Sequence, residues 1–212
     1  LATALFAPFL PALFVVLLCI ICSALIGAAW AFIPGYLQAK RGSHVVITTI
    51  MFNFLASSLM FYLLAGPLIQ LGQQSPQSDL IPESAQLASF ETFFSLFGID
   101  ITSSPLNLSF LLALFALFVF WVLIWKTRLG YEIRAVGKNQ DAANYAGINV
   151  PKIIIITMTI SGAFAGLLAV NEVMGVQHRA ILNFTAGYGF TGIAVALMGR
   201  NHPVGIFFAS LL

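Results

Sequence analysis

Long uncharged apolar runs constrain this chain more than any other feature of its sequence. No charged residue occurs from Leu1 to Ala39, and further apolar runs follow along the chain. A helix rises about 1.5 Å per residue, so about 20 apolar residues are needed to cross the hydrocarbon of a bilayer. The runs predict membrane spans at about 12–32, 45–65, 108–125 and 153–171, a short one at 186–199, and a last one at 204–212 and onward.

The overall composition agrees with a bilayer as the solvent. Charged residues make up 8% of the 212 residues and hydrophobic residues 60%, against roughly 25% charged residues in a soluble domain. We therefore predict an all-α fold, a polytopic transmembrane helix bundle, because a barrel would show alternating segments of about ten residues. The chain starts without Met and stops inside an apolar run, so we expect a single membrane domain, 1–212, truncated at both ends.

The basic residues predict the orientation. If each span crosses once, all Lys and Arg except Arg179 fall on one side, and such an excess marks the cytoplasmic side. The loop 126–152 is then cytoplasmic. The loop 67–107, which has no Lys or Arg, is then external; its acidic residues are Asp79, Glu83, Glu91 and Asp100. A formal charge of +2 gives no reason to expect a nucleic-acid partner.

The cytoplasmic loop contains the signals of a short helix. Asn139 is suited to be its N-cap, Asp141 lies in the first turn, and Gly147 suits the left-handed position after the end. Pro151 suits the first turn of the next span. A helix this short needs a partner surface. Small residues would allow close docking there, namely Ala142, Ala143 and Ala146; the alternative is a loop packed on its own bundle.

Several motifs, in order, resemble the membrane permease of bacterial ABC importers, in the branch that handles nucleosides and simple sugars. They are Ala39–Gly42, Thr48–Asn53, Arg128–Val150, Ser161–Gly166 and Gly187–Arg200, and they cover nearly the whole chain. Many relatives carry Asn-Glu where this chain has Ser43-His44, a departure that bears on the substrate more than on the family.

The resemblance implies a fragment of a larger permease in the bacterial inner membrane, working by alternating access. Its implied partners are ABC ATPase subunits, a second permease subunit in a homo- or heterodimer, and an external substrate-binding protein. ATP and Mg would belong to the ATPase, so this chain would need no cofactor and would not be an enzyme. The ATPase-coupling helix would comprise Gly137, Asn139, Asp141, Ala142, Ala143, Ala146 and Gly147.

Polar residues at four-residue spacing mark one face of the second span. Thr49, Asn53 and Ser57 share that face, and polar groups in a span usually face the bundle interior or a cavity. We assign them, with the neighbouring Phe52 as a candidate stacking residue, to a candidate substrate path. Hydrogen bonding between helices, for the polar residues, and lipid or core packing, for Phe52, are the alternatives.

Glycines at regular spacing predict close helix packing. Gly162 and Gly166 form a small-residue seam. Gly187, Gly189 and Gly192 match the dinucleotide fingerprint, but no strand precedes them, so packing is the preferred interpretation.

The remaining reactive groups do not suggest chemistry. The histidines (His44, His178 and His202) lie at different predicted membrane levels, so no metal site is expected. Cys19 and Cys22 lie in an uncharged run and are interpreted as small core residues. Glu172 at the outer end of a span is either a solvated interfacial carboxylate or part of an entrance or partner contact.

Two other functions stay open. An ion-coupled secondary transporter would need carboxylates or broken helices within the spans, and none of the predicted spans contains Asp or Glu. A non-transporting membrane scaffold is the other alternative.

Overall fold

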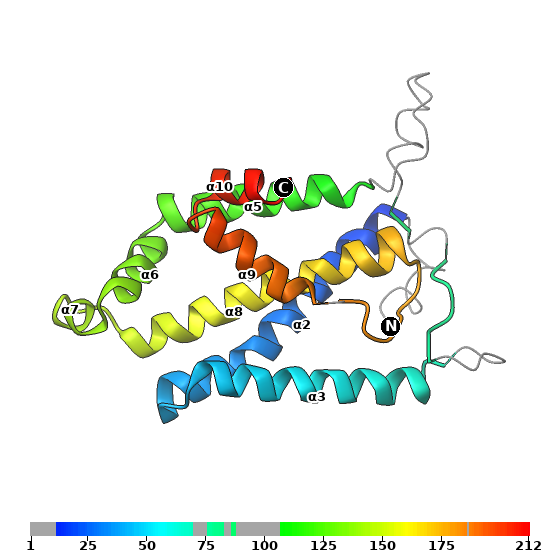
Figure 1. The fold of residues 1–212 in the computed structure, drawn as a ribbon, viewed down its shortest axis with the longest axis horizontal. Helices are drawn as coiled ribbons and strands as arrows, with labels where there is room; N and C mark the ends of the chain where they lie inside the picture. The colour runs from blue at the N-terminus through cyan, green and yellow to red at the C-terminus, as the bar shows by residue number, and fades with distance from the viewer. Residues whose placement is uncertain (1–11, 70–75, 83–85, 88–106, 186) are drawn as a thin grey trace, which may run out of the picture. The chain divides into compact units, whose positions relative to one another are not determined.

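The computed structural model describes residues 12–69, 76–82, 86–87, 107–185 and 187–212, and within them the regular secondary structure is helical (Figure 1). This helical content confirms the all-α fold class. The described residues also contain an isolated antiparallel bridge, between Gln77 and Ile181. The chain divides into two compact units, one of Leu1–Leu111 with Ile154–Leu182 and one of Leu112–Ile153 with Asn183–Leu212.

In the first unit, α2 spans Ala12–Arg41 and α3 spans Val45–Ala65. Helix α2 continues past the predicted end at 32, through Pro34, to the basic residues of its last turn. A tight turn joins the two helices, and Gly42 at φ 64° supplies its left-handed residue. An edge-on contact between Trp30 and Phe52, with ring centroids 5.7 Å apart, also joins them.

Helix α8 (Val150–Ala169) continues directly into a π-helix, η2 (Val170–Val176). The amide of Gln177 donates to the Glu172 carbonyl at 2.8 Å, the five-residue spacing of a π-turn. The predicted span 153–171 is thus part of a longer apolar helix that includes Glu172. The helix that contains this predicted span therefore carries a carboxylate just beyond the predicted end.

Helices α2 and α8 contact each other backbone to backbone in the first unit. A Cβ on Gly162 would overlap Ala31 and the Gly27 carbonyl, and one on Gly166 would overlap the Ser23 carbonyl. The Ser23 hydroxyl donates to the carbonyl of Gly166. Since higher numbers on α2 meet lower numbers on α8, the two helices run antiparallel, as Figure 1 also shows.

After η2, two extended segments of the first unit pair through backbone hydrogen bonds. The amide of Ser78 donates to the Ala180 carbonyl at 3.0 Å, and that of Ile81 to the His178 carbonyl at 2.8 Å. Arg179 donates to the Gln77 side chain at 3.3 Å. Parts of the predicted external loop 67–107 and of the connection after 171 therefore meet here. The acidic residues Glu83, Glu91 and Asp100 lie outside the described residues.

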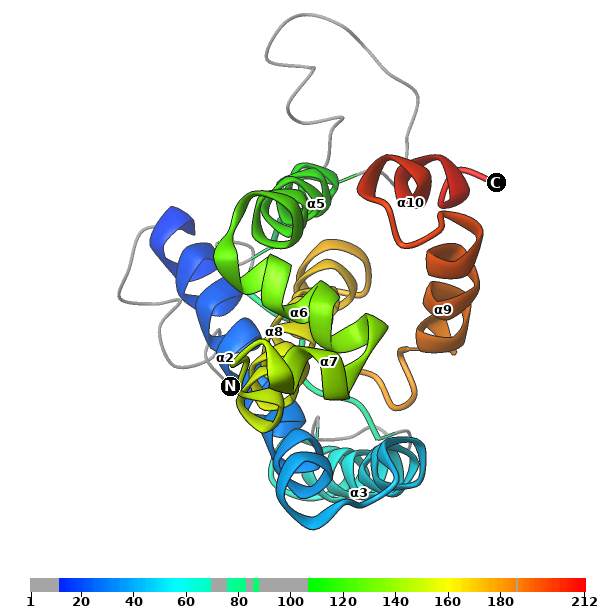
Figure 2. The same cartoon turned by 90° about the vertical axis from the view of Figure 1, so that its left-hand side faces the viewer.

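The second unit contains most of α5 (Ser109–Lys126), followed by α6 (Arg128–Lys138) and α7 (Gln140–Tyr145). It also contains α9 (Tyr188–Met198) and α10 (Pro203–Ala209), which form a hairpin (Figure 2). Helix α9 has 11 residues, so it is about 16 Å long, roughly half the hydrocarbon thickness.

Among the residues that the structure describes, four helical segments are long and apolar enough to cross a membrane: Phe14–Arg41, Val45–Ala65, Ser109–Lys126 and Val150–Val176. The chain itself covers little of them; none of the apolar window of α3 is buried. Apolar side chains left uncovered in this way need a bilayer or another helix against them.

Candidate functional site

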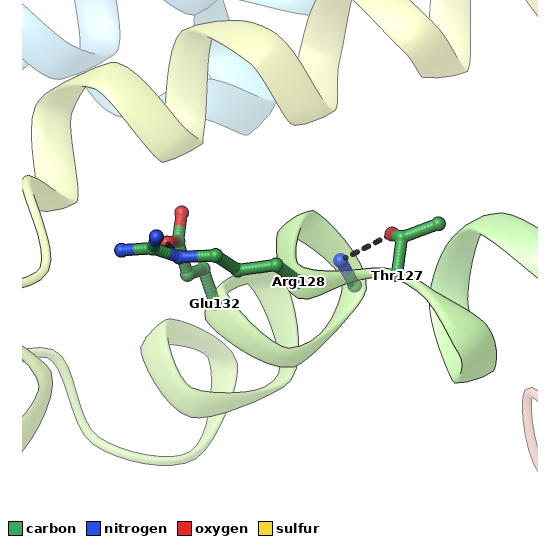
Figure 3. Close-up of polar contacts among 4 residues, drawn as sticks. Thr127, Arg128 and Glu132 are labelled. Atoms are coloured by element: carbon green, nitrogen blue, oxygen red, sulfur yellow. Dashed lines mark hydrogen bonds and ion pairs between the residues drawn. The ribbon is translucent and has the colours of Figure 1, made fainter.

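The segment that links α5 to α8 is capped at each turn. The Thr127 side chain accepts a hydrogen bond from the Gly130 amide at 3.1 Å and so caps α6 (Figure 3). Arg128 and Glu132, four residues apart on α6, form an ion pair at 3.1 Å. Helix α6 was not predicted, although a Thr cap marks a helix start and an i,i+4 charge pair supports a helix.

Helix α6 follows α5 closely because of Gly130. A Cβ at this position would overlap the carbonyls of Leu123 and Ile124, so only glycine fits. Apolar residues recur at i, i+4 and i+7 on α6 (Leu129, Ile133 and Val136) and define one face. Val136 is buried, so this face packs against the protein and fixes α6 to its surface.

Helix α7 forms as the sequence predicts. Asn139 accepts hydrogen bonds from the amides of Asp141 and Ala142 at 2.9 and 3.1 Å, which confirms it as the N-cap. Gly147 has φ 80°, which confirms the predicted left-handed residue. Asp141 lies in the first turn of α7, and Pro151 lies in the first turn of α8.

The outer face of α7 differs from the predicted one. Ala143 is 3% exposed and packs inside the protein, whereas Ala142 and Ala146 are exposed. Tyr145 is 95% exposed and, with Asp141 and Asn144, lines a shallow hollow. Gly137, at the end of α6, is also exposed. The surface that α7 offers to a partner therefore consists of Asp141, Ala142, Asn144, Tyr145 and Ala146, called the α7 face below.

The Asn139 cap leads to a first prediction. Asn139→Ala should remove the acceptor of the Asp141 and Ala142 amides and cost about 1 kcal/mol locally, so that these amides exchange with solvent about fivefold faster. Hydrogen exchange read by mass spectrometry would measure this. Asn139→Asp keeps the acceptor and should keep the protection; equal exchange in all three proteins would contradict the cap.

The candidate substrate-path residues all lie on α3. Asn53 and Ser57 are exposed on α3. The Thr49 hydroxyl donates to the Val45 carbonyl of its own helix at 2.9 Å, and Phe52 contacts Trp30. They share one side of α3, so their assignment to a substrate path stays a prediction.

The predicted packing glycines fall into two groups. Gly162 and Gly166 lie in the close contact between α8 and α2. Gly187, Gly189 and Gly192 have open space around a would-be Cβ, so the described residues show no packing there. Gly187 instead has φ 85° and provides the left-handed turn before α9.

A buried polar cluster was missed by the sequence analysis. The Ser109 hydroxyl lies within hydrogen-bond distance of the side-chain oxygens of Asn107 and, at 2.5 Å, Asn171. The Asn171 amide donates to the Glu172 carboxylate at 3.3 Å. Glu172 is 6% exposed, so its interpretation as a solvated interfacial carboxylate is wrong. The adjacent pair Asn171-Glu172, at the end of an apolar run, was the available signal.

No group of three or more His, Cys, Asp or Glu that could hold a metal occurs among the described residues. Cys19 is buried and Cys22 half-buried, and both are free thiols.

Comparisons with known proteins give one family. The family described as "Branched-chain amino acid transport system / permease component" matches residues 1–212. The guanosine ABC transporter permease protein NupP of Bacillus subtilis is 41% identical over 92% of this chain and 54% of its own length. The nucleoside ABC transporter permease protein NupB of Lactococcus lactis is 38% identical over 97% of this chain and 56% of its own.

A third relative is named for a sugar. The glucose ABC transporter permease protein TsgB13 of Haloferax volcanii is 37% identical over 95% of this chain and 54% of its own length. The chain thus spans about half the length of the curated relatives it matches. No solved structure gives a significant match.

Proposed function

Because the chain belongs to the branched-chain amino acid transport system / permease component family, we propose that it forms part of the solute passage of an ATP-driven importer. It is a multi-pass membrane protein, with helices long and apolar enough to cross a bilayer. The observation that carries the proposal is the match over residues 1–212 to permeases of this kind.

The proposed substrate class rests on the names of the relatives. NupP is named for guanosine, NupB for nucleosides and TsgB13 for glucose. We assign this chain to the import of a nucleoside or a simple sugar. We assign the protein to the bacterial inner membrane. A second permease subunit completes the passage, and an external binding protein delivers the solute.

The energy comes from separate ATPase subunits that hold ATP and Mg; this chain holds no cofactor and performs no catalysis. The α7 face is the part of the chain suited to receive the ATPase. Tyr145 stands out from it almost fully exposed, and large exposed aromatic side chains are typical anchors of protein interfaces. The capped ends of α7 give it a fixed shape. Docking there lets closure of the ATPases push on α6 and α7 and so change which side of the membrane the passage faces.

The buried Glu172 keeps one alternative in view, since an ion-coupled transporter uses carboxylates within its spans. The two mechanisms separate in proteoliposomes that contain the full-length permease, its ATPase subunits and its binding protein. We expect uptake of labelled guanosine, ribose or glucose only with hydrolysable ATP, and unchanged uptake when an ionophore dissipates ion gradients. Uptake that needs no ATPase and stops with the ionophore would contradict the importer. A complex that takes up none of these solutes, but whose loss removes another membrane assembly, would indicate a scaffold.

A further inference from the structure

Trp125, in the last turn of α5, contacts two different parts of the second unit. The Arg134 guanidinium from α6 lies 4.6 Å from the centre of the Trp125 ring. The His202 ring, from the turn between α9 and α10, has its centroid 5.5 Å from that of Trp125. The Arg134 contact lies within the range of about 6 Å over which a cation interacts with a ring face, and the Trp125–His202 separation lies within the range of about 4.5–7 Å of paired aromatic rings. One indole therefore joins the segment 112–153 to the segment 183–212.

The turn that presents His202 has a fixed shape. Arg200 and Asn201 have φ of 52° and 54°, which is uncommon for residues other than glycine. The amide of Asn201 donates to the Ala196 carbonyl at 2.9 Å, and that of His202 to the Gly199 carbonyl at 3.0 Å. A backbone in this conformation persists only where its surroundings hold it. His202 is thus placed against Trp125 by the turn itself.

Helices α9 and α10 move as one body with that turn. A Cβ on Gly199 would fall 2.7 Å from the Gly205 carbonyl carbon, and one on Gly205 would overlap the Gly199 carbonyl. Backbones in such close contact cannot slide past each other without separating. A displacement of His202 is therefore a displacement of the whole α9–α10 hairpin.

Arg134 is held on α6, the helix that leads directly into α7. Its Nε donates to the Gly130 carbonyl at 3.3 Å, which holds the guanidinium along α6. Asn139 ends α6 and caps α7, and Figure 2 shows the two helices side by side. A push on α7 therefore moves Arg134 as well.

We propose that Trp125 is a positioning residue that carries displacement of α6 and α7 to the α9–α10 hairpin through the stack Arg134–Trp125–His202. This role rests on the proposed function, because the displacement originates in an ATPase docked on the α7 face. The stack itself is a structural tie that exists without the ATPase.

Trp125→Leu removes the ring but keeps an apolar side chain at a position that is 42% exposed, so little packing is lost. In the reconstituted importer we expect the variant to hydrolyse ATP, while solute taken up per ATP falls at least about fivefold, the lower end of usual coupling effects. Trp121→Leu is the matched control, because the cation over the Trp121 ring belongs to the same helix: the Lys126 Nζ lies 5.3 Å from the ring centroid. It should couple normally, and Trp125→Phe, which keeps a ring face, should restore part of the coupling.

A second measurement needs no ATPase. Spin labels on Tyr145→Cys of α7 and Ser210→Cys after α10 report the distance between the two elements in a full-length protein whose native cysteines, Cys19 and Cys22 among them, are replaced by serine. We expect a narrow distance distribution with Trp125, a broadened one with Trp125→Leu and a narrow one with Trp121→Leu. A distribution that stays narrow with Trp125→Leu would overturn the tie. Broadening with unchanged coupling would overturn the mechanical role, and failure of the proposed function would appear as no ATP-driven uptake even in the unsubstituted protein.

Discussion

Gly162→Leu is expected to lower the stability of the protein strongly. The new side chain would have to occupy space held by Ala31 and by the Gly27 carbonyl of α2. Because backbone stands in the way, no rotamer change relieves the overlap and the helices must separate. Overpacking of this kind costs about 1–3 kcal/mol, and with backbone in the way we expect the upper end of that range.

The measurement is the thermal unfolding of the full-length protein in detergent, followed by fluorescence or by loss of monodispersity. Gly189→Leu is the matched control, since nothing lies within 4 Å of a Cβ at that glycine. We expect a clear fall in melting temperature for Gly162→Leu and little change for Gly189→Leu. Equal melting temperatures for these two variants would show that the α2–α8 seam is not as close as described.

Gly147→Val is expected to uncouple solute import from ATP hydrolysis. Gly147 has φ 80°, and a β-branched residue resists this conformation. The strain is about 2 kcal/mol, enough to lower the population of correctly ended α7 about thirtyfold. Since no atom lies within 4 Å of a Cβ there, the effect comes from backbone conformation and not from a clash. The measurement is the ATPase activity of the reconstituted importer, and we expect substrate to stimulate it less in this variant than in the unsubstituted protein.

Two further variants separate the coupling role from general strain. Gly147→Asn should keep most of the stimulation, because asparagine tolerates the left-handed region. Gly187→Val introduces the same kind of strain at φ 85°, again in open space, but before α9. It should lose less stimulation than Gly147→Val. Equal losses at both positions would mean that strain anywhere in the second unit is enough.

Local signals predicted α7 well because they act over a few residues. The Asn139 cap and the left-handed Gly147 depend only on neighbouring backbone groups, and both are found as predicted. The docking face was predicted less well for a geometric reason. Ala142 and Ala146 are four residues apart and share a side, but Ala143 is rotated by about 100° from Ala142 and is buried instead.

The other features of the fold and of the candidate site depend on contacts between segments that are far apart in the sequence or that only the structure places together. Helix α6 was missed because a glycine such as Gly130 is typical of a loop, and its close contact with the end of α5 is visible only in the structure. The partner of the Gly162–Gly166 seam was visible only as small residues at four-residue spacing on α2: Ser23, Gly27, Ala31 and Gly35. Glu172 looked interfacial because the predicted span ended at 171, whereas the helix continues as η2.

The π-turn at η2 holds one residue more than an α-turn would, so it acts as an insertion that the helix has absorbed. Every position after it is rotated by about 100° relative to an uninterrupted α-helix. That phase shift changes which side of the helix the residues at the end of η2 occupy, relative to the side of α8 that meets α2. Gly175 there faces Asn107, whose side chain a Cβ would overlap, so the extra residue decides which position of the helix has to be a glycine.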